Sequence, residues 1–203
     1  LPAAVAGLKT CGIRGFNLTM PNKNKIVELL DELSPEAQLI GAVNTVLNDN
    51  GKLIGYNTDG YGFMQSVRDA GHDITGKNIT VMGVGGASMA ICAQSALHGA
   101  ASVHNIARRP SRKWNLTQKY AEKLSAKTRC QVCLFDNDDH TALRDSIAQS
   151  YLLINATSVG MVPDIDDTII KDTSLFHPEL VVADVVYEPQ ETRLLREAKA
   201  TGC

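Results

Sequence analysis

The sequence predicts an α/β protein in which a doubly wound parallel sheet follows a smaller α/β unit. From Gly76 onward, short apolar runs alternate with helical patterns, which is typical of a parallel sheet with helices on both faces. Before that point, the pattern predicts shorter strands and helices, and two of the strands are joined by a predicted hairpin. The polar, glycine-bracketed segment 71–77 separates the two patterns. We therefore expect one domain over residues 1–75 and a second over 76–203.

Turn and cap residues organise the first unit. Asp49-Asn50-Gly51 predicts a hairpin, because Asn-Gly readily adopts positive φ. Ser34 followed by Pro35 indicates a helix start, with serine as the cap. The remaining pattern predicts helices over 3–11, 23–33 and 60–70, and strands over 15–19, 43–48 and 53–56.

The second unit is predicted from its apolar runs. Five of them have strand length and are separated by helical periodicity. The predicted strands cover 78–82, 103–107, 132–135, 151–156 and 180–186, and the predicted helices cover 87–99, 111–126 and 141–149.

Composition limits the classes of function. The chain has 203 residues, 44% of them hydrophobic and 21% charged, with a net charge of −2. This balance argues against nucleic acid or an anionic membrane surface as a partner. No apolar run approaches the roughly 18 residues of a membrane span, and no secretory leader is visible, so we expect a cytoplasmic protein. Because the chain begins at Leu1 and not at methionine, we expect that a preceding segment is missing.

Cysteine and histidine residues do not predict a metal site. The five cysteines have irregular spacing, and Cys130-Gln-Val-Cys133 is a single CxxC within the strand-like segment 129–135. Reduced, packed thiols fit this pattern better than metal ligands or a redox pair. The five histidines are scattered without ligand spacing.

A glycine-rich turn is the strongest motif in the chain. Gly83-Val84-Gly85-Gly86-Ala87-Ser88 lies between a predicted strand and a predicted helix. Residues without a Cβ let backbone N–H groups approach a pyrophosphate at a helix N-terminus. The context predicts a Rossmann-like cofactor domain, with a tight turn that binds nothing as the alternative.

Three polar clusters lie at the ends of predicted strands, amino or carboxyl, in the first unit. They are Asn17–Lys23, Asn44-Thr45 and Thr58-Asp59. Lys23 at a predicted helix start lies against the helix dipole, which favours the neutral amine needed for proton transfer. Asp59 read alone predicts a helix cap. Taken together, the clusters predict a ligand site on loops held by a rigid scaffold.

These motifs, in this order, resemble the shikimate dehydrogenase family. The matching segments are Asn17–Lys23, Gly41–Thr45, Asn57–Gly60, the glycine turn, 155–161 and 184–189. Met20-Pro21-Asn22-Lys23 is similar to the quinate/shikimate branch. The resemblance covers the chain from about Gly12 to its end.

The resemblance implies a substrate domain, a nicotinamide cofactor domain and specific residue roles. Lys23 and Asp59 would form the catalytic proton-transfer pair, and Thr19, Asn44 and Thr58 would bind ring hydroxyls of shikimate or quinate. The cleft near the nicotinamide would be lined by Met161, Val185 and Tyr187, with Tyr187 on the substrate. The cofactor-binding set would comprise the turn residues 83–88 with Ala107, Arg108, Arg109, Ser158, Met161 and Val185.

The choice of cofactor follows from charge. NAD sites usually carry an acid about 20 residues past the glycines, on the ribose hydroxyls. Here the predicted strand 103–107 has no acid, and Arg108 and Arg109 follow it. Guanidinium groups suit the 2′-phosphate of NADP. NADP is therefore favoured, and NAD stays open.

Two family motifs have no counterpart in the chain. The serine-rich motif near the family's N-terminus and the motif after its last strand are absent, so we expect a protein truncated at both ends. The alternatives are a non-catalytic ligand-binding or regulatory protein on the same fold, and a dehydrogenase for another cyclic polyol, such as an amino-substituted shikimate. The oligomeric state stays open, with a homodimer as one option.

Overall fold

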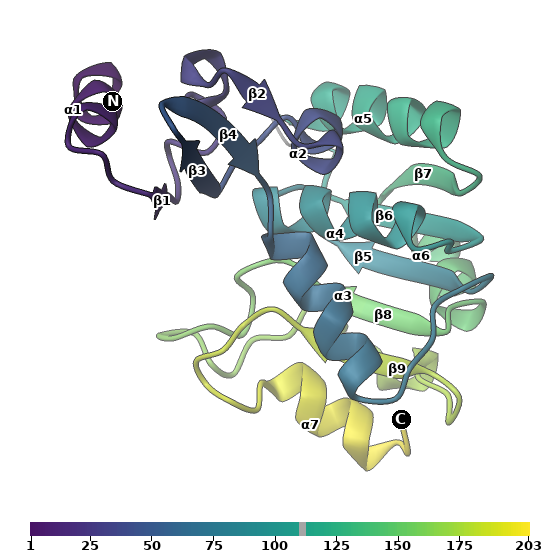
Figure 1. The fold of residues 1–203 in the computed structure, drawn as a ribbon. Coiled ribbons are helices and arrows are strands. Elements are labelled where there is room, and N and C mark those ends of the chain that lie inside the picture. Colours follow the sequence, from purple (N-terminus) through teal and green to yellow (C-terminus); the bar gives the residue numbers. More distant parts are fainter. Residues whose placement is uncertain (110–112) are drawn as a thin grey trace.

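The first unit is a four-stranded sheet with two helices. The computed structural model describes residues 1–109 and 113–203, and Figure 1 shows their arrangement. The strands are ordered β1-β3-β4-β2; β3 is antiparallel to β1 and β4, whereas β2 is parallel to β4. The elements are α1 (Pro2–Thr10), β1 (Gly15–Asn17), β2 (Glu32–Leu33), α2 (Pro35–Ile40), β3 (Thr45–Asp49) and β4 (Lys52–Tyr56).

Two local predictions in this unit are confirmed. The β3–β4 hairpin turns at Asn50 and Gly51, which have φ values of 51° and 91°. Ser34 caps α2, and its hydroxyl accepts a hydrogen bond from the Ala37 N–H at 3.1 Å. The helix ends at Gly41 with φ of 72°, which leads the chain into the polar segment that follows.

The predicted helix over 23–33 is wrong. The segment forms turns, a short 3-10 helix (Val27–Leu29) and then β2. Its polar groups bond across to other segments in place of a regular helical ladder. The Lys23 carbonyl accepts from the Val43 N–H at 2.9 Å, and the Asn24 side chain donates to the Gly41 carbonyl at 2.8 Å.

The second unit is a five-stranded, all-parallel sheet, as predicted. The strand order is β7-β6-β5-β8-β9, and all neighbouring strands are parallel. The chain adds β6 and β7 on one side of β5, and then adds β8 and β9 on its other side. This doubly wound order creates a crevice at the carboxyl ends of β5 and β8. The strands are β5 (Asn78–Met82), β6 (Ser102–Ala107), β7 (Gln131–Asp136), β8 (Leu152–Asn155) and β9 (Val181–Asp184).

Helices cover both faces of this sheet. One core cluster joins α4 (Gly86–Leu97) and α5 (Trp114–Lys127) to the sheet, and another joins α6 (His140–Ala148) and α7 (Arg193–Ala200) to the opposite face. α7 was not predicted, and the 3-10 helix Thr173–Leu175 precedes β9. The first residues of the predicted helix 111–126 lie outside the described residues.

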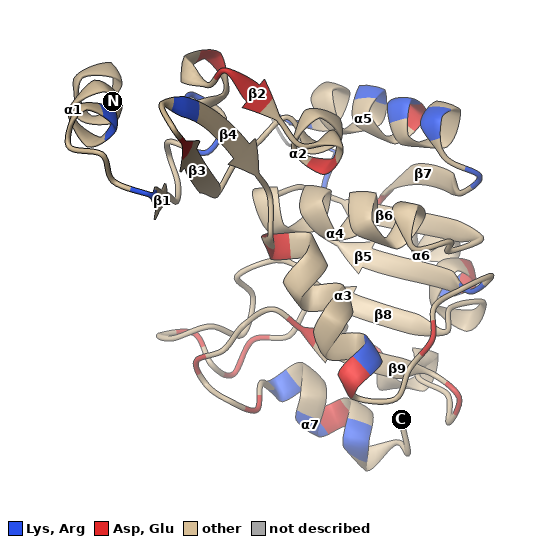
Figure 2. Ribbon diagram, viewed as in Figure 1, with Lys and Arg blue, Asp and Glu red and all other residues tan. Residues whose placement is uncertain are grey.

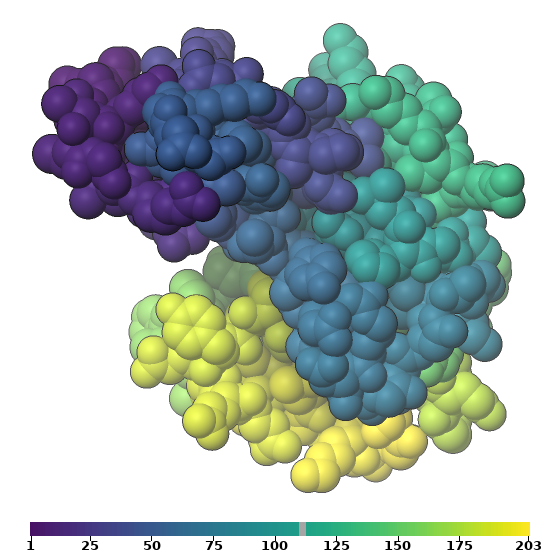
Figure 3. All heavy atoms as spheres, viewed as in Figure 1, coloured from purple at the N-terminus to yellow at the C-terminus, as the bar shows by residue number. Residues whose placement is uncertain are grey.

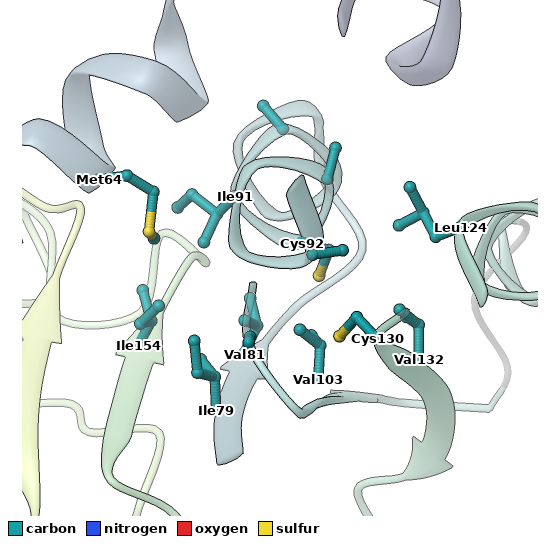
Figure 4. Close-up of a cluster of buried hydrophobic side chains, with 14 of the residues drawn as sticks. Met64, Ile79, Val81, Ile91, Cys92, Val103, Leu124, Cys130, Val132 and Ile154 are labelled. Carbon is teal, nitrogen blue, oxygen red and sulfur yellow. The ribbon is translucent and has the colours of Figure 1, made fainter. Parts of the chain in front are cut away.

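The helix α3 (Asp59–Asp69) follows the first sheet but packs on the second. Its Met64 is 1% exposed and contributes to the core of the parallel sheet. Figure 4 shows Met64 beside Ile91 of α4 and Ile154 of β8. A domain boundary near residue 75 stays a prediction, and packing associates α3 with the parallel sheet.

Acidic and basic residues are spread over both units in the view of Figure 2. No helix in the described part of the chain has the length and apolar character needed to cross a membrane.

α3 lies directly on α4 because Gly60 has no side chain. A Cβ at Gly60 would lie 2.3 Å from the Ala90 carbonyl oxygen, closer than real Cβ atoms approach. On the same helix, a Cβ at Gly62 would meet no atom within 4 Å. The contact at Gly60 therefore sets how closely the two helices approach.

Gly60→Ala is expected to lower the free energy of unfolding by about 1–3 kcal/mol, because backbone atoms must move apart. Gly62→Ala is the matched control and should raise it by up to about 1 kcal/mol through helix propensity. Urea denaturation of both variants measures the difference. Equal stability of the two variants would contradict the proposed close contact.

Candidate active site

A lysine–aspartate pair lies at the end of the first sheet. Lys23 Nζ donates to Asp59 Oδ2 at 2.6 Å, and their side chains are 20% and 34% exposed. Lys23 comes from the turns after β1, whereas Asp59 is the first residue of α3. The chain thus brings together two charged groups that are 36 residues apart. The pair is reachable by a ligand while partly shielded from water.

Asn44 fixes the carboxylate of Asp59. Its amide nitrogen donates to Asp59 Oδ1 at 2.7 Å and to Thr58 Oγ1 at 3.0 Å. Its amide oxygen accepts from the Thr58 N–H at 3.0 Å and from Thr45 Oγ1 at 3.0 Å. A carboxylate requires a donor and a backbone N–H requires an acceptor, so only one orientation of the amide satisfies both. Asp59 is therefore held at both oxygens.

Two predicted features of these residues are wrong. Asp59 does not cap α3: the N-cap position is Thr58, it has no side-chain cap bond, and the Asp59 side chain binds Lys23 and Asn44. Lys23 does not begin a helix, so the predicted position at the start of its own helix is wrong. Its environment is set by the ion pair. Thr19 is exposed just before Met20, at the turn in which the Thr19 carbonyl accepts from the Asn22 N–H.

Thr45 and Asn17 extend the network beyond the residues to which the resemblance assigns a role. Asn17 Nδ2 donates to Thr45 Oγ1 at 2.9 Å and to the Asn44 carbonyl at 3.3 Å. Both residues were singled out as polar strand ends, but their pairing depends on the antiparallel register in which Asn17 lies opposite Thr45. The sequence does not reveal that register.

The glycine turn fits the pyrophosphate of a dinucleotide. Gly83 has φ of 108°, and a Cβ there would lie 2.8 Å from Thr157 Cγ2. A Cβ at Gly85 or Gly86 would meet no atom within 4 Å, so the space above the turn is open. Gly85 is the N-cap of α4, and no side chain caps this helix. An open helix N-terminus flanked by glycines suits an anion.

The side chains of Ser88 and Asn105 support the turn from within. Ser88 is fully buried, and its hydroxyl donates to the Gly83 carbonyl at 2.6 Å. Asn105 of β6 donates to the same carbonyl at 2.7 Å and to the Val81 carbonyl at 3.0 Å. Val84 and Ala87 complete the turn. Sequence reasoning missed Asn105, whose polar side chain within an apolar strand is the available signal.

Arg108 and Arg109 follow the carboxyl end of β6. Both are exposed, directly after the buried Ala107. The Arg109 N–H donates to Asp136 Oδ1 at 3.3 Å, which ties this segment to the end of β7. The two guanidinium groups thus belong to the same sheet edge as the glycine turn.

Two loops follow β8 and β9 at that edge. Ser158 is exposed in the first loop, where its carbonyl accepts from the Met161 N–H. Met161 is 43% exposed and Tyr187 is 83% exposed. Val185 directly follows β9, and its N–H donates to the Asn155 carbonyl at 3.0 Å. The Val162 N–H donates to the Glu188 carbonyl at 3.2 Å, which joins the loops to each other.

The surface is hollowed between the first unit and the C-terminal segment in Figure 3. The loops that follow β8 and β9 extend toward this hollow in Figure 1, and the start of α3 lies beside it. The lysine–aspartate pair and the glycine turn therefore belong to neighbouring edges of the two units. Of the residues that the structure describes, no group of three His, Cys, Asp or Glu residues could hold a metal ion.

Two α/β units, one with a half-buried lysine–carboxylate pair and one with an open glycine-rich helix N-terminus, define the class of nicotinamide-dinucleotide-dependent dehydrogenases. Residues 1–46 match the family model of the shikimate dehydrogenase substrate binding domain. The chain is 47% identical over 203 residues to the shikimate dehydrogenase (NADP(+)) of Listeria innocua, covering all of this chain and 69% of that protein. The chain belongs to the shikimate dehydrogenase family.

Solved structures agree with this assignment. The shikimate 5-dehydrogenase of Listeria monocytogenes in complex with shikimate and NAD has a TM-score of 0.96 at 46% identity, with all of this chain and 70% of that chain covered. The quinate dehydrogenase of Corynebacterium glutamicum in complex with NAD has a TM-score of 0.87 at 32% identity, again over all of this chain and 70% of that chain. The resemblance and the two-unit α/β fold expected from the sequence are confirmed.

Gly85→Ala is expected to weaken cofactor binding by about 10- to 100-fold, because a Cβ displaces a pyrophosphate from N–H groups whose bonds contribute about 1.5–3 kcal/mol. Stability should not change, since no protein atom lies near that Cβ. Gly83→Ala is the contrasting variant, which should destabilise the fold by about 1–3 kcal/mol. Calorimetric titration with NADP and thermal unfolding separate the effects. Unchanged cofactor affinity in folded Gly85→Ala would argue against the site.

Proposed function

We propose that this protein interconverts shikimate and 3-dehydroshikimate by hydride transfer with NADP, and that NAD is an alternative cofactor. The observation that carries the proposal is the pair Lys23–Asp59, in which Nζ lies 2.6 Å from Oδ2. Asn44 orients the carboxylate of this pair. A protein that only binds a ligand has no need of a proton-transfer pair. Membership of the shikimate dehydrogenase family supports the same activity.

Lys23 is the group that holds and moves the proton. Oxidation of a secondary alcohol leaves a proton on its oxygen, and a base within hydrogen-bond reach must accept it. Lys23 Nζ accepts that proton as the neutral amine, and in the reverse direction the ammonium returns it to the ketone oxygen. Asp59 stabilises the ammonium through the ion pair and orients the amine.

The neighbouring hydroxyl and amide groups bind the ring. We propose that Thr58, Asn44 and Thr19 hydrogen-bond the hydroxyl groups of the substrate from the first unit. Asn44 is 9% exposed, so its contribution is mainly to orient Asp59 and Thr58. Tyr187 would contact the substrate from the loop after β9, and its high exposure leaves the phenol accessible to a ligand.

The cofactor-binding edge of the second unit is assigned in the same way. The turn residues 83–87 would hold the pyrophosphate, with Ser88 supporting the turn from within. Ala107, Arg108 and Arg109 would hold the adenosine ribose and its 2′-phosphate. Ser158, Met161 and Val185 would border the nicotinamide. When bound, the cofactor supplies the hydride acceptor or donor. The protein contributes position and charge.

Quinate is the second candidate substrate. Quinate and shikimate differ in the substituents of the same kind of ring. This chain shares its fold with a quinate dehydrogenase, at a TM-score of 0.87. Offering both compounds to the intact protein, with NADP and with NAD, ranks the four combinations by the absorbance of reduced nicotinamide. Turnover with neither compound would refute the proposed reaction.

Lys23→Met is expected to lower kcat by roughly 10²–10⁴-fold, the range typical of losing a general acid or base. Cofactor affinity should stay the same, because Lys23 belongs to the other unit. Lys25→Met is the matched control: it changes an exposed lysine two residues away and should leave kcat unchanged. Near-normal turnover in Lys23→Met would remove the lysine from the mechanism.

Replacing Arg108 and Arg109 together with alanine should raise the KM for NADP by about 10-fold or more, because each hydrogen bond to a phosphate contributes about 1.5–3 kcal/mol. The KM for NAD should be nearly unaffected, since NAD has no 2′-phosphate. Arg129→Ala serves as the control, as Arg129 is exposed before the amino end of β7, at the opposite edge of the sheet. An equal effect on both cofactors would exclude a phosphate clamp.

A further inference from the structure

The ends of β8 and β9 are joined by a buried asparagine and a half-buried aspartate that no part of the proposed chemistry uses. Asn155 and Asp184 are the last residues of the two strands and are register partners. Asn155 Nδ2 donates to Asp184 Oδ1 at 3.0 Å, and Asn155 is 1% exposed. The link lies next to the point between β5 and β8 where the strand order reverses.

Asp184 also fixes both ends of the loop that follows β9. The Val186 N–H donates to Asp184 Oδ1 at 2.9 Å, and Thr192 Oγ1 donates to Oδ2 at 2.8 Å. Thr192 is the N-cap of α7 and is 1% exposed. One carboxylate therefore holds the start of the loop and its return to the helix, with Tyr187 between them.

Asn155 fixes the other loop in the same way. Its amide oxygen accepts from the Thr157 N–H at 3.1 Å and from Thr157 Oγ1 at 2.7 Å. Its amide nitrogen donates to the Val159 carbonyl at 3.1 Å as well as to Asp184. Because the nitrogen serves a carbonyl and a carboxylate, the orientation of the amide is determined. The segment that leads to Met161 is thus tied to Asp184 through one side chain.

The cost of burying the Asp184 carboxylate argues against a role in packing alone. Burial raises the pKa of the Asp184 carboxyl, although its hydrogen bonds oppose that shift. The donors around it are an amide, a hydroxyl and backbone N–H groups, all of them neutral. Burying a carboxylate without a cation is costly, and apolar side chains can join two strands at no such cost. A carboxylate that accepts from three separate segments offers what apolar packing does not, namely fixed directions for each segment.

We infer that Asp184 is a positioning residue for hydride transfer, which holds the loops of Met161 and Tyr187 in one arrangement against the nicotinamide and the substrate. The inference rests on the proposed function, because that function assigns the nicotinamide to these loops. Asp184 touches neither reactant. It acts through Asn155, Thr192 and the backbone.

Asp184→Asn is the first test. The amide nitrogen that replaces Oδ2 can only donate, so the Thr192 hydroxyl proton loses its acceptor, while most of the side-chain volume is kept. We expect kcat with shikimate to fall by about 10- to 100-fold, the scale of effect for a misplacement of about 1 Å. The affinity for adenosine 2′,5′-bisphosphate should not change, because that fragment lacks the nicotinamide. Calorimetric titration of the intact protein measures this affinity.

The isotope effect provides the readout that a purely structural role would not move. With shikimate deuterated at the carbon that loses hydride, the observed isotope effect on kcat should rise in Asp184→Asn, because hydride transfer becomes rate-limiting. Asp172→Asn is the matched control, because the Asp172 carboxylate caps a 3-10 helix through Ser174. This variant should leave kcat, the bisphosphate affinity and the isotope effect unchanged.

Thr192 keeps the inference testable if Asp184→Asn fails to fold. Thr192→Ser retains the hydroxyl and should keep kcat, whereas Thr192→Val removes it and should reproduce the kcat loss. Normal kcat in folded Asp184→Asn, or a parallel loss of bisphosphate affinity, would overturn the inference. Wild-type protein that binds cofactor but reduces none with shikimate or quinate would refute the proposed function instead.

Discussion

The close approach of α3 to α4 at Gly60 is the contact on which the rest of the site depends. Asp59 directly precedes Gly60, and a Cβ at Gly60 would lie 2.3 Å from the Ala90 carbonyl oxygen. The first turn of α3 is thereby pressed against the helix whose N-terminus carries the glycine turn. A chain segment that begins in the first sheet thus ends on the second. The position of the carboxylate relative to the cofactor edge follows from this backbone contact and not from any long side chain.

Asn44 fixes the Asp59 carboxylate on a backbone that the contact at Gly60 already holds in place. Its amide bonds to both Thr58 and Asp59, so the start of α3 is tied to the residue that directly precedes β3. A pair of long, exposed side chains gains little from an ion pair, because ordering them costs entropy. Here one partner is already immobile, so that only Lys23 has to be ordered. The arrangement suits a group that must meet a substrate oxygen repeatedly in the same place.

Much of the fold could be predicted, and the failures have physical causes. Alternating apolar runs after Gly76 predict the parallel sheet because each run must be buried on both faces. The segment 23–33 has helical periodicity, yet Lys23 and Asn24 direct their backbone and side-chain groups to Gly41 and Val43. Such contacts join residues almost 20 positions apart, and local pattern does not encode them. For the same reason the local pattern around Asp59 indicates only a cap, because its partner Lys23 is 36 residues away. The pair itself is predicted only from the family resemblance. The ordered motifs identified the family, whereas the roles of Asn105 and Asp184 depend on strand register.

The two halves of the proposed cofactor edge differ in how firmly their residues are fixed. Arg108 and Arg109 are exposed, and a guanidinium can reach a phosphate in several rotamers because charge attraction depends weakly on angle. Hydride transfer has no such freedom, since the reacting atoms must approach to about 3–3.5 Å with their orbitals aligned. The loops after β8 and β9 are correspondingly held by Asn155, Asp184 and Thr192, each bonded to more than one segment. Hydrogen bonds in fixed directions therefore lie beside the proposed site of hydride transfer, and exposed positive charge lies where the proposed phosphate requires only affinity.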